Sequence, residues 1–252
     1  MLTADLSRWT DRVALVTGAS SGIGEAIAQR LVHEGMQVVG CARRIDRLLH
    51  LRERLGARFL PEACDLRDPA QVEALFDRLE ARGLSPSVLV NNTGLARKDS
   101  LIDGSTEGWR EMFEVNVIAL CQCTQRAVQA MRAADDDGVV IHISSLAAHR
   151  VPVGGNSVYA ATKHAVRALT EGLRQELHAA GSGVRVSAVS PGLVETEFPA
   201  VYHGSAAAAA LAAADFPLLH PTDVADAVAW ILSQPPHVQV HDLLLRPRRQ
   251  PN

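Results

Sequence analysis

The residues best suited to chemistry are Tyr159 and Lys163, which lie four positions apart where a helix is expected to begin. At that spacing both side chains lie on one face of the helix. An ammonium group beside a phenol favours the phenolate and lowers the pKa of the tyrosine from about 10. Tyr159 is therefore predicted to give or take a proton at the oxygen of a carbonyl or an alcohol. In isolation, a Tyr-x-x-x-Lys pair is more often an exposed helical pair with no catalytic role.

Two further polar features fall near this pair. The apolar segment 139–144 is expected to be a strand, and it ends at Ser144 and Ser145. A serine at that point can hydrogen-bond a substrate oxygen. Asn116 lies on an apolar helical stripe with Met112 and Cys123, where a buried amide must find partners. It is either part of the same site or a core asparagine bonded to the backbone.

A glycine-rich segment follows the first expected strand. Residues 17–24 read TGASSGIG, and a helical pattern begins at once. Glycines let the backbone approach a pyrophosphate closely, and the free N–H groups at a helix start favour an anion. The segment predicts a dinucleotide site; its members are Gly18, Ser20, Ser21, Gly22, Ile23 and Gly24.

The end of the second expected strand indicates which dinucleotide binds. NAD-dependent proteins place an acidic residue there, on the ribose 2′-hydroxyl. This chain has Arg43 and Arg44, and Asp46 lies beyond both. Two guanidinium groups are suited to a 2′-phosphate. The pair predicts NADP(H) rather than NAD(H), the alternative being a solvated basic pair at a helix start.

Strands and helices must alternate to position these residues. Continuous apolar runs predict strands at 13–17, 37–41, 59–63, 88–91, 139–144, 185–190 and 242–245. Helical periodicity follows the first strand and recurs at 45–55, 69–82, 109–132, 159–179 and 222–233. Such alternation predicts an α/β fold, a single doubly wound parallel sheet of about seven strands with helices on both faces. One Rossmann-type domain is expected over residues 1–252, with its ligands at the carboxyl edge of the sheet.

Composition excludes several classes of protein. The chain has 252 residues, 47% hydrophobic and 21% charged, with a formal net charge of −3. This is typical of a folded domain, and it offers no bulk positive charge for a nucleic acid. Neither metal-ligand spacing nor a Cys-x-x-Cys pair occurs, and Cys41, Cys64, Cys121 and Cys123 are expected to be small buried side chains. A polar N-terminus and the lack of an apolar run near 20 residues predict a cytoplasmic protein without a membrane span.

Five motifs together resemble the short-chain dehydrogenase/reductase family. They are TGASSGIG at 17–24, Asn-Asn-Thr-Gly at 91–94, Asn116, Ser145 and Tyr-x-x-x-Lys at 159–163. The similarity covers about residues 12–250. It implies hydride transfer to or from a nicotinamide, a small carbonyl or alcohol substrate, and a homodimer or homotetramer.

The resemblance also implies a role for each matched residue. Tyr159 would be the acid/base, Ser145 would polarise the substrate oxygen, and Lys163 would bind the nicotinamide ribose and lower the pKa of Tyr159. Asn116 would hold a water molecule in a proton relay. The remaining cofactor contacts would be Asp65 and Leu66 at the adenine, Asn92 and Gly94 in the cleft, and Pro191, Gly192, Val194 and Thr196 at the nicotinamide end.

Two departures from the family pattern affect the site. Thr93 stands where the family has alanine, which adds bulk beside the cofactor. The spacing from Ser145 to Tyr159 is 14 positions, one more than usual, so Ser144 stays an alternative. The extra residue is expected to loop out within 152–157.

Substrate class is predicted less directly. Segments at 40–43, 149–151, 168–177, 190–198 and 237–247 are similar to a subgroup that reduces carbonyl compounds and keto-steroids. An apolar lid at 192–221, with Tyr202 and Phe216, suits a hydrophobic ketone. The main hypothesis is an NADPH-dependent carbonyl reductase. The alternatives are an NADP-dependent 3-hydroxy acid dehydrogenase, with His149 and Arg150 as carboxylate partners, and a non-catalytic NADP(H) sensor.

Overall fold

Buried strands and amphipathic helices alternate along the computed structural model, which describes residues 5–152, 157–203, 205 and 215–251. The strands are β1 (Val13–Thr17), β2 (Gln37–Ala42), β3 (Phe59–Ala63), β4 (Val88–Asn91), β5 (Val139–Ile143), β6 (Arg185–Pro191) and β7 (Asp242–Leu245). The α-helices are α1 (Gly22–His33), α2 (Ile45–Leu55), α3 (Pro69–Ala81), α4 (Thr106–Phe113), α5 (Ala119–Ala133), α6 (Ser157–Ala179), α7 (Phe198–His203) and α9 (Pro221–Ser233). Short turns are η1 (Ser7–Trp9), η2 (Glu114–Ile118) and η3 (Leu146–Ala148).

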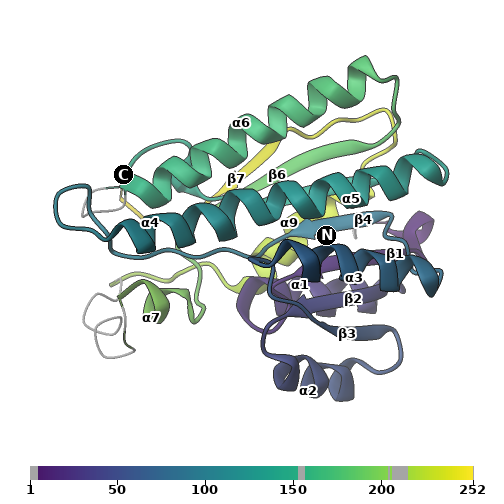
Figure 1. The fold of residues 1–252 in the computed structure, drawn as a ribbon, viewed down its shortest axis with the longest axis horizontal. Coiled ribbons are helices and arrows are strands. Elements are labelled where there is room, and N and C mark those ends of the chain that lie inside the picture. The colour runs from purple at the N-terminus through teal and green to yellow at the C-terminus, as the bar shows by residue number, and fades with distance from the viewer. Residues whose placement is uncertain (1–4, 153–156, 204, 206–214, 252) are drawn as a thin grey trace.

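The strands form one sheet of seven in the order β3-β2-β1-β4-β5-β6-β7, with every neighbouring pair parallel. β3 and β7 lie at its two ends (Figure 1). The doubly wound sheet predicted from the sequence is confirmed. Chain order reverses between β1 and β4, and open α/β sheets bind ligands at the carboxyl edge beside such a reversal.

Two hydrophobic cores lie on the two faces of the sheet. Alternate β1 side chains enter different cores, Ala14 and Val16 on one face and Val13 and Leu15 on the other. The first core is covered by α1, α2 and α9, and the second by α3, α5 and α6. Burial of the strands on both faces explains their continuous apolar runs.

The expected helix at 109–132 is the main difference from the prediction. The helix begins earlier, at Thr106, because the Ser105 hydroxyl accepts a hydrogen bond from the Gly108 N–H at 3.0 Å. It is then interrupted by the π-helical turn η2 before α5 continues. A π-turn inserts one residue into the helix and shifts the direction of the side chains around it. The other expected elements differ from the observed ones by three residues or fewer at their ends.

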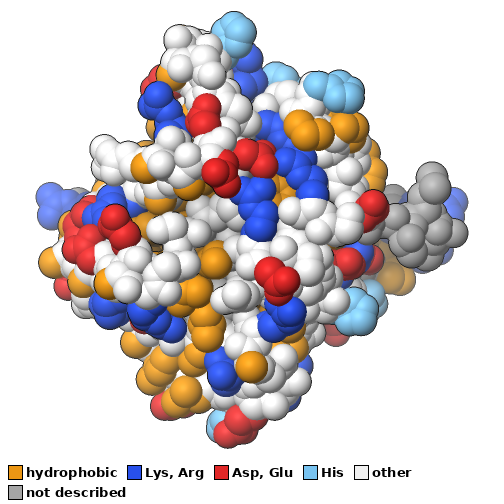
Figure 2. Space-filling view, turned by 90° about the vertical axis from the view of Figure 1, so that its right-hand side faces the viewer, with side chains coloured by type: hydrophobic (Ala, Val, Ile, Leu, Met, Phe, Trp, Pro, Cys, Tyr) orange, Lys and Arg blue, Asp and Glu red, His pale blue; other side chains and the backbone are white. Residues whose placement is uncertain are grey.

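Charged residues of both signs lie close together on the face shown in Figure 2. No helix among the described residues is long and apolar enough to cross a membrane. Cys41, Cys64 and Cys123 are buried as expected, whereas Cys121 is half-buried. The alanine-rich run at 206–214 and most of the expected loop-out at 152–157 lie outside the described residues.

Candidate active site

The glycine-rich loop joins β1 to α1 and requires glycine at three positions. Gly18 and Gly22 have φ values of +67° and +58°, in the left-handed region that favours glycine. A Cβ on Gly24 would collide with the Asn92 side-chain nitrogen and the Gly18 carbonyl oxygen. The three glycines therefore let the loop turn into α1 while packing closely against its neighbours, and the loop leads into a helix start, where an anion is favoured.

Residues at the end of β4 fix this loop in place. The Thr17 hydroxyl accepts hydrogen bonds from the N–H groups of Asn92 at 3.0 Å and Thr93 at 3.1 Å. The Asn92 amide in turn donates to the Thr17 carbonyl at 2.9 Å. The extra hydroxyl of Thr93 is buried, and it lies 2.9 Å from the place a Cβ on Gly18 would take. The bulk of Thr93 is therefore packed against the glycine-rich loop.

Arg44 extends from the end of β2 over the same loop. Its Nη2 donates to the hydroxyls of Ser21 at 2.9 Å and Ser20 at 3.2 Å. Arg43 is exposed beside it, near enough to Asp65 to contribute to the low pKa of that carboxyl group, which the hydrogen bond from Arg67 chiefly causes. A cationic edge thus stands next to the loop, where the sequence predicted the 2′-phosphate site.

The predicted adenine contacts lie close by. Asp65 follows β3 and receives a hydrogen bond from the Arg67 guanidinium at 2.7 Å. Leu66 is buried next to it. Both residues lie in the segment that follows β3, the strand that pairs with β2.

Tyr159, Ser145 and Lys163 come together at the carboxyl edge of β5. Ser145 begins the turn η3, where its hydroxyl accepts a hydrogen bond from the Ala147 N–H at 3.1 Å. The Ser145 side chain also lies near enough to the phenol of Tyr159 to oppose the rise of its pKa. The Ser144 hydroxyl is buried and has no hydrogen-bond partner. The geometry therefore favours Ser145 over Ser144 as the partner of the tyrosine.

Lys163 is almost completely buried. Its Nζ donates to the Ile143 carbonyl at 3.0 Å and lies 6.0 Å from the centroid of the Tyr159 ring. Burial lowers the pKa of Lys163 to about 8. Burial also raises the pKa of Tyr159 to about 12. The sequence predicted a lowered tyrosine pKa, and that direction is wrong for this structure because desolvation of the phenolate outweighs the opposing effect of Ser145.

Asn116 lies on the π-turn η2 and connects the β4 loop to α6. Its Oδ1 accepts from the Leu95 N–H at 2.7 Å, and its Nδ2 donates to the Leu95 carbonyl at 2.8 Å and the Thr162 hydroxyl at 3.0 Å. A Cβ placed on Gly94 would lie 3.6 Å from Lys163 Nζ and 3.7 Å from Asn116 Oδ1. Asn116 is thus bonded to the backbone, and its side chain and that of Lys163 both lie beside Gly94; its part in the site stays a prediction.

The segment after β6 completes the site. Pro191 is buried at the end of β6, and the Gly192 N–H donates to the Leu245 carbonyl at 2.7 Å. Val194 pairs with Leu219 in an isolated bridge. The Thr196 methyl group lies 3.1 Å from the place a Cβ on Gly22 would take. The segment therefore passes over the start of α1.

The sequence reasoning missed the aromatic contact to the tyrosine. Tyr202 and Phe216 were expected as aromatic residues of the lid, but the ring packed against Tyr159 is Phe198, with centroids 5.9 Å apart at 54°. The sequence could have pointed to Phe198, because this residue directly follows Thr196 and Glu197 in the irregular stretch after β6, at the edge of the sheet. Part of the expected lid, residue 204 and residues 206–214, lies outside the described residues.

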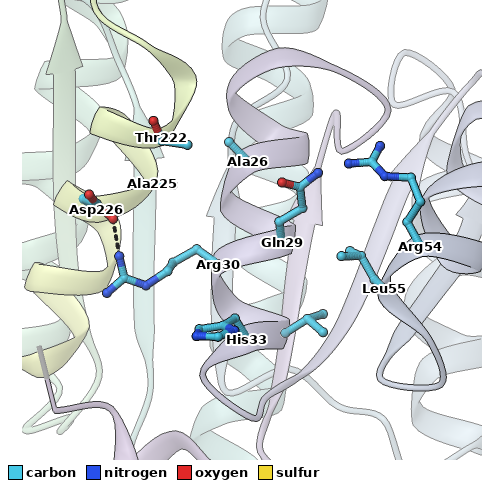
Figure 3. Close-up of a pocket in the computed structure, with 10 residues that line it drawn as sticks. Ala26, Gln29, Arg30, His33, Arg54, Leu55, Thr222, Ala225 and Asp226 are labelled. Atoms are coloured by element: carbon cyan, nitrogen blue, oxygen red, sulfur yellow. Dashed lines mark hydrogen bonds and ion pairs between the residues drawn. The ribbon is translucent and has the colours of Figure 1, made fainter. Parts of the chain in front are cut away.

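One other cavity, of about 570 Å³, lies between α1, α2 and α9 (Figure 3). None of the predicted site residues lines it. Its cations are already paired, Arg30 with Asp226 and Glu34, and Arg54 with Glu25. Both guanidinium groups at this cavity are therefore already compensated by carboxylates.

A tyrosine and a buried lysine on α6, with a glycine-rich loop at the same edge of a doubly wound sheet, fit a dinucleotide-dependent oxidoreductase. The family model described as short chain dehydrogenase matches residues 12–203. The chain belongs to the short-chain dehydrogenase family.

Individual relatives extend this similarity over nearly the whole chain. The chain is 46% identical to dehydrogenase/reductase SDR family member 11 of Bos taurus, over 97% of this chain and 99% of that one. It is 39% identical to the farnesol dehydrogenase of Aedes aegypti, over 96% of this chain and 98% of that one. A solved structure of the closed form of serine dehydrogenase with NADP+ superposes with a TM-score of 0.90 at 34% identity, covering 95% of this chain and 96% of that one.

Proposed function

We propose that this oxidoreductase is an NADPH-dependent carbonyl reductase, reversible as an alcohol dehydrogenase. The observation that carries the proposal is the grouping of Ser145, Tyr159 and Lys163 at the sheet edge that also holds the glycine-rich loop. A carbonyl oxygen bound by these two hydroxyl groups lies within reach of a proton donor. The dinucleotide, when bound, supplies or accepts a hydride.

The chain's own residues perform the proton chemistry. The high pKa of Tyr159 keeps its phenol protonated, so the group is available as a donor to a developing alkoxide. Ser145 is anchored by the Ala147 N–H, which fixes its hydroxyl where it polarises the substrate oxygen. Lys163 is held by the Ile143 carbonyl behind the tyrosine, where its charge favours proton loss in the reverse direction.

The site fits NADP(H). The glycine-rich loop at the start of α1 suits the pyrophosphate, and Arg44 beside Ser20 and Ser21 offers donors to a 2′-phosphate. The serine dehydrogenase that superposes on this chain is described with NADP+ bound. In contrast, no carboxylate follows β2 before Asp46.

A hydrophobic ketone or aldehyde is the proposed substrate class. Phe198 packs beside Tyr159 and is 37% exposed, so an apolar ring faces the space next to the proton donor. The relative at 39% identity is named a farnesol dehydrogenase, and farnesol is an apolar alcohol, which supports a substrate of apolar character.

The test is NADPH oxidation across ketosteroids, α-diketones, aldehydes and 3-oxo acids, with Ser145→Ala, Ser144→Ala and Tyr159→Phe as variants. Tyr159→Phe should abolish turnover while NADPH still binds, as measured by cofactor fluorescence. Ser145→Ala should lower kcat about 10²-fold or more, the usual cost of one oxyanion donor. Ser144→Ala is the matched control and should retain activity. Activity lost only in Ser144→Ala, or retained in Tyr159→Phe, would refute the assignment.

Oxidation of a 3-hydroxy acid is the second candidate, favoured by the similarity to serine dehydrogenase. A carboxylate substrate needs a cation, and His149 was one expected partner. Its Nε2 is already 3.0 Å from the Asp242 carboxylate and 3.2 Å from the Ser190 hydroxyl. This pairing weakens the candidate, which NADP+ reduction with serine and 3-hydroxybutyrate tests directly.

Assembly, location and the lid remain predictions. A homodimer or homotetramer is proposed, supported by the exposed apolar side chains of Phe113 and Ile118 on α4 and η2. Light scattering of the purified protein measures the assembly. Fractionation of the source cells tests the predicted cytoplasmic location, and cofactor protection of residues 192–203 from proteolysis tests the lid.

A further inference from the structure

Three consecutive residues after β6 contact three different parts of the site. The Thr196 methyl group lies against Gly22 of the glycine-rich loop, and the Phe198 ring lies against Tyr159. Between them, the Glu197 carboxylate reaches across to the arginines at the start of α2. One short segment therefore joins the proton donor to the cationic edge.

Glu197 binds two of these arginines at once. Both of its oxygens accept from Arg47 Nη1, at 2.7 and 2.8 Å. The oxygen Oε2 also accepts from Arg44 Nη1 at 3.2 Å. All three side chains are about half exposed, at 52% for Glu197, 44% for Arg47 and 48% for Arg44. The guanidinium groups, Arg47 foremost, lower the pKa of Glu197, so the carboxylate is charged at neutral pH.

Arg44 is thereby engaged through both terminal nitrogens. Nη2 donates to the hydroxyls of Ser20 and Ser21, and Nη1 donates to Glu197. A phosphate prefers two parallel N–H donors from one guanidinium. A 2′-phosphate that binds Arg44 in this way must therefore displace the Glu197 carboxylate from Nη1, or else bind with that negative charge a few ångströms away.

We propose that Glu197 is a specificity-determining residue that competes with the cofactor 2′-phosphate for Arg44 and so limits the preference for NADP(H) over NAD(H). The inference rests on the proposed use of NADP(H). When a phosphate binds Arg44, the carboxylate keeps its two shorter contacts to Arg47. Glu197 can therefore leave Arg44 while the segment carrying Phe198 stays attached to α2.

Binding of fragments isolates this competition from catalysis. Adenosine 2′,5′-bisphosphate and adenosine 5′-monophosphate differ only in the 2′-phosphate, and calorimetry gives the Kd of each. Glu197→Gln should tighten the bisphosphate about two- to fivefold, the range of an exposed ion pair, and leave the monophosphate unchanged. Glu195→Gln is the matched control, because Glu195 is exposed two positions earlier and its carboxylate faces His220 at 3.3 Å.

A double-mutant cycle shows whether Arg44 carries the effect. In an Arg44→Gln background the Glu197→Gln substitution should no longer tighten the bisphosphate. An equal gain in that background, an equal gain in Glu195→Gln, or weaker bisphosphate binding by Glu197→Gln would each overturn the inference while leaving the proposed cofactor intact. If the parent protein bound both fragments equally and Glu197→Gln did not change this, the proposed NADP(H) preference would fail as well.

Discussion

Replacing Lys163 by methionine should change how the stability of the fold depends on pH. The Lys163 ammonium is buried in the folded chain, where its pKa is lowered from 10.5 to about 8. A folded-state pKa below the unfolded value means that the charged lysine destabilises the fold. That destabilisation is complete below about pH 8 and is relieved as the pH rises towards 10.5. At 1.36 kcal/mol per unit it amounts to about 3 kcal/mol.

Urea unfolding of the protein without cofactor measures this effect. Between about pH 7 and about pH 9.5 the free energy of unfolding of the parent should rise by about 2 kcal/mol more than that of Lys163→Met. Other titrating groups cancel in the comparison, because they are common to both proteins. The chain has only two lysines, so Lys98→Met, at an exposed position, is the matched control and should follow the parent. Parallel pH profiles for the parent and Lys163→Met would show that the lysine is not held in a desolvated place, and the reasoning would fail.

Three further predictions follow from individual contacts. Asn116→Ala removes the side-chain partners of the Leu95 N–H and carbonyl and one of the two partners of the Thr162 hydroxyl, and should lower the free energy of unfolding by about 2–4 kcal/mol; a loss below about 1 kcal/mol would contradict it. Gly24→Ala should prevent folding or dinucleotide binding, whereas Gly172→Ala, in α6 with open space around the added methyl group, should stabilise the fold by about 0.5–1 kcal/mol in the same assay. Arg44→Gln should lower kcat/KM for NADPH and leave that for NADH nearly unchanged, and equal losses for both would count against a phosphate-reading role.

The fold could be predicted from the sequence because each strand is buried on both faces. Such strands appear as unbroken apolar runs, and the helices between them impose parallel pairing. The positions of Tyr159 and Lys163 followed from their helical spacing, and that of the glycine-rich loop from its place after β1. Local pattern is sufficient for these features, since each depends on residues near in sequence.

The rest of the site depends on contacts that local pattern does not encode. The π-turn η2 inserts a residue into an apparently continuous helical stripe, so the surroundings of Asn116 could not be read from periodicity. The contacts of Phe198 with Tyr159 and of Glu197 with Arg44 join segments about 40 and 150 positions apart. The raised pKa of Tyr159 reflects how much water the fold excludes, which spacing along a helix does not determine.

The site holds side chains whose effects on folding and on function oppose each other. At pH 7 the buried ammonium of Lys163 opposes folding by about 3 kcal/mol, because burial removes its charge from water. Lys163→Met should therefore be more stable than the parent near neutral pH and yet be impaired as a catalyst. Glu197 shows the converse at the nucleotide end, since its carboxylate stabilises the segment after β6 by engaging the cation that the phosphate needs. Lys163→Met is therefore expected to strengthen the fold and impair proton transfer, whereas Glu197→Gln is expected to weaken the attachment of the segment after β6 and sharpen cofactor choice.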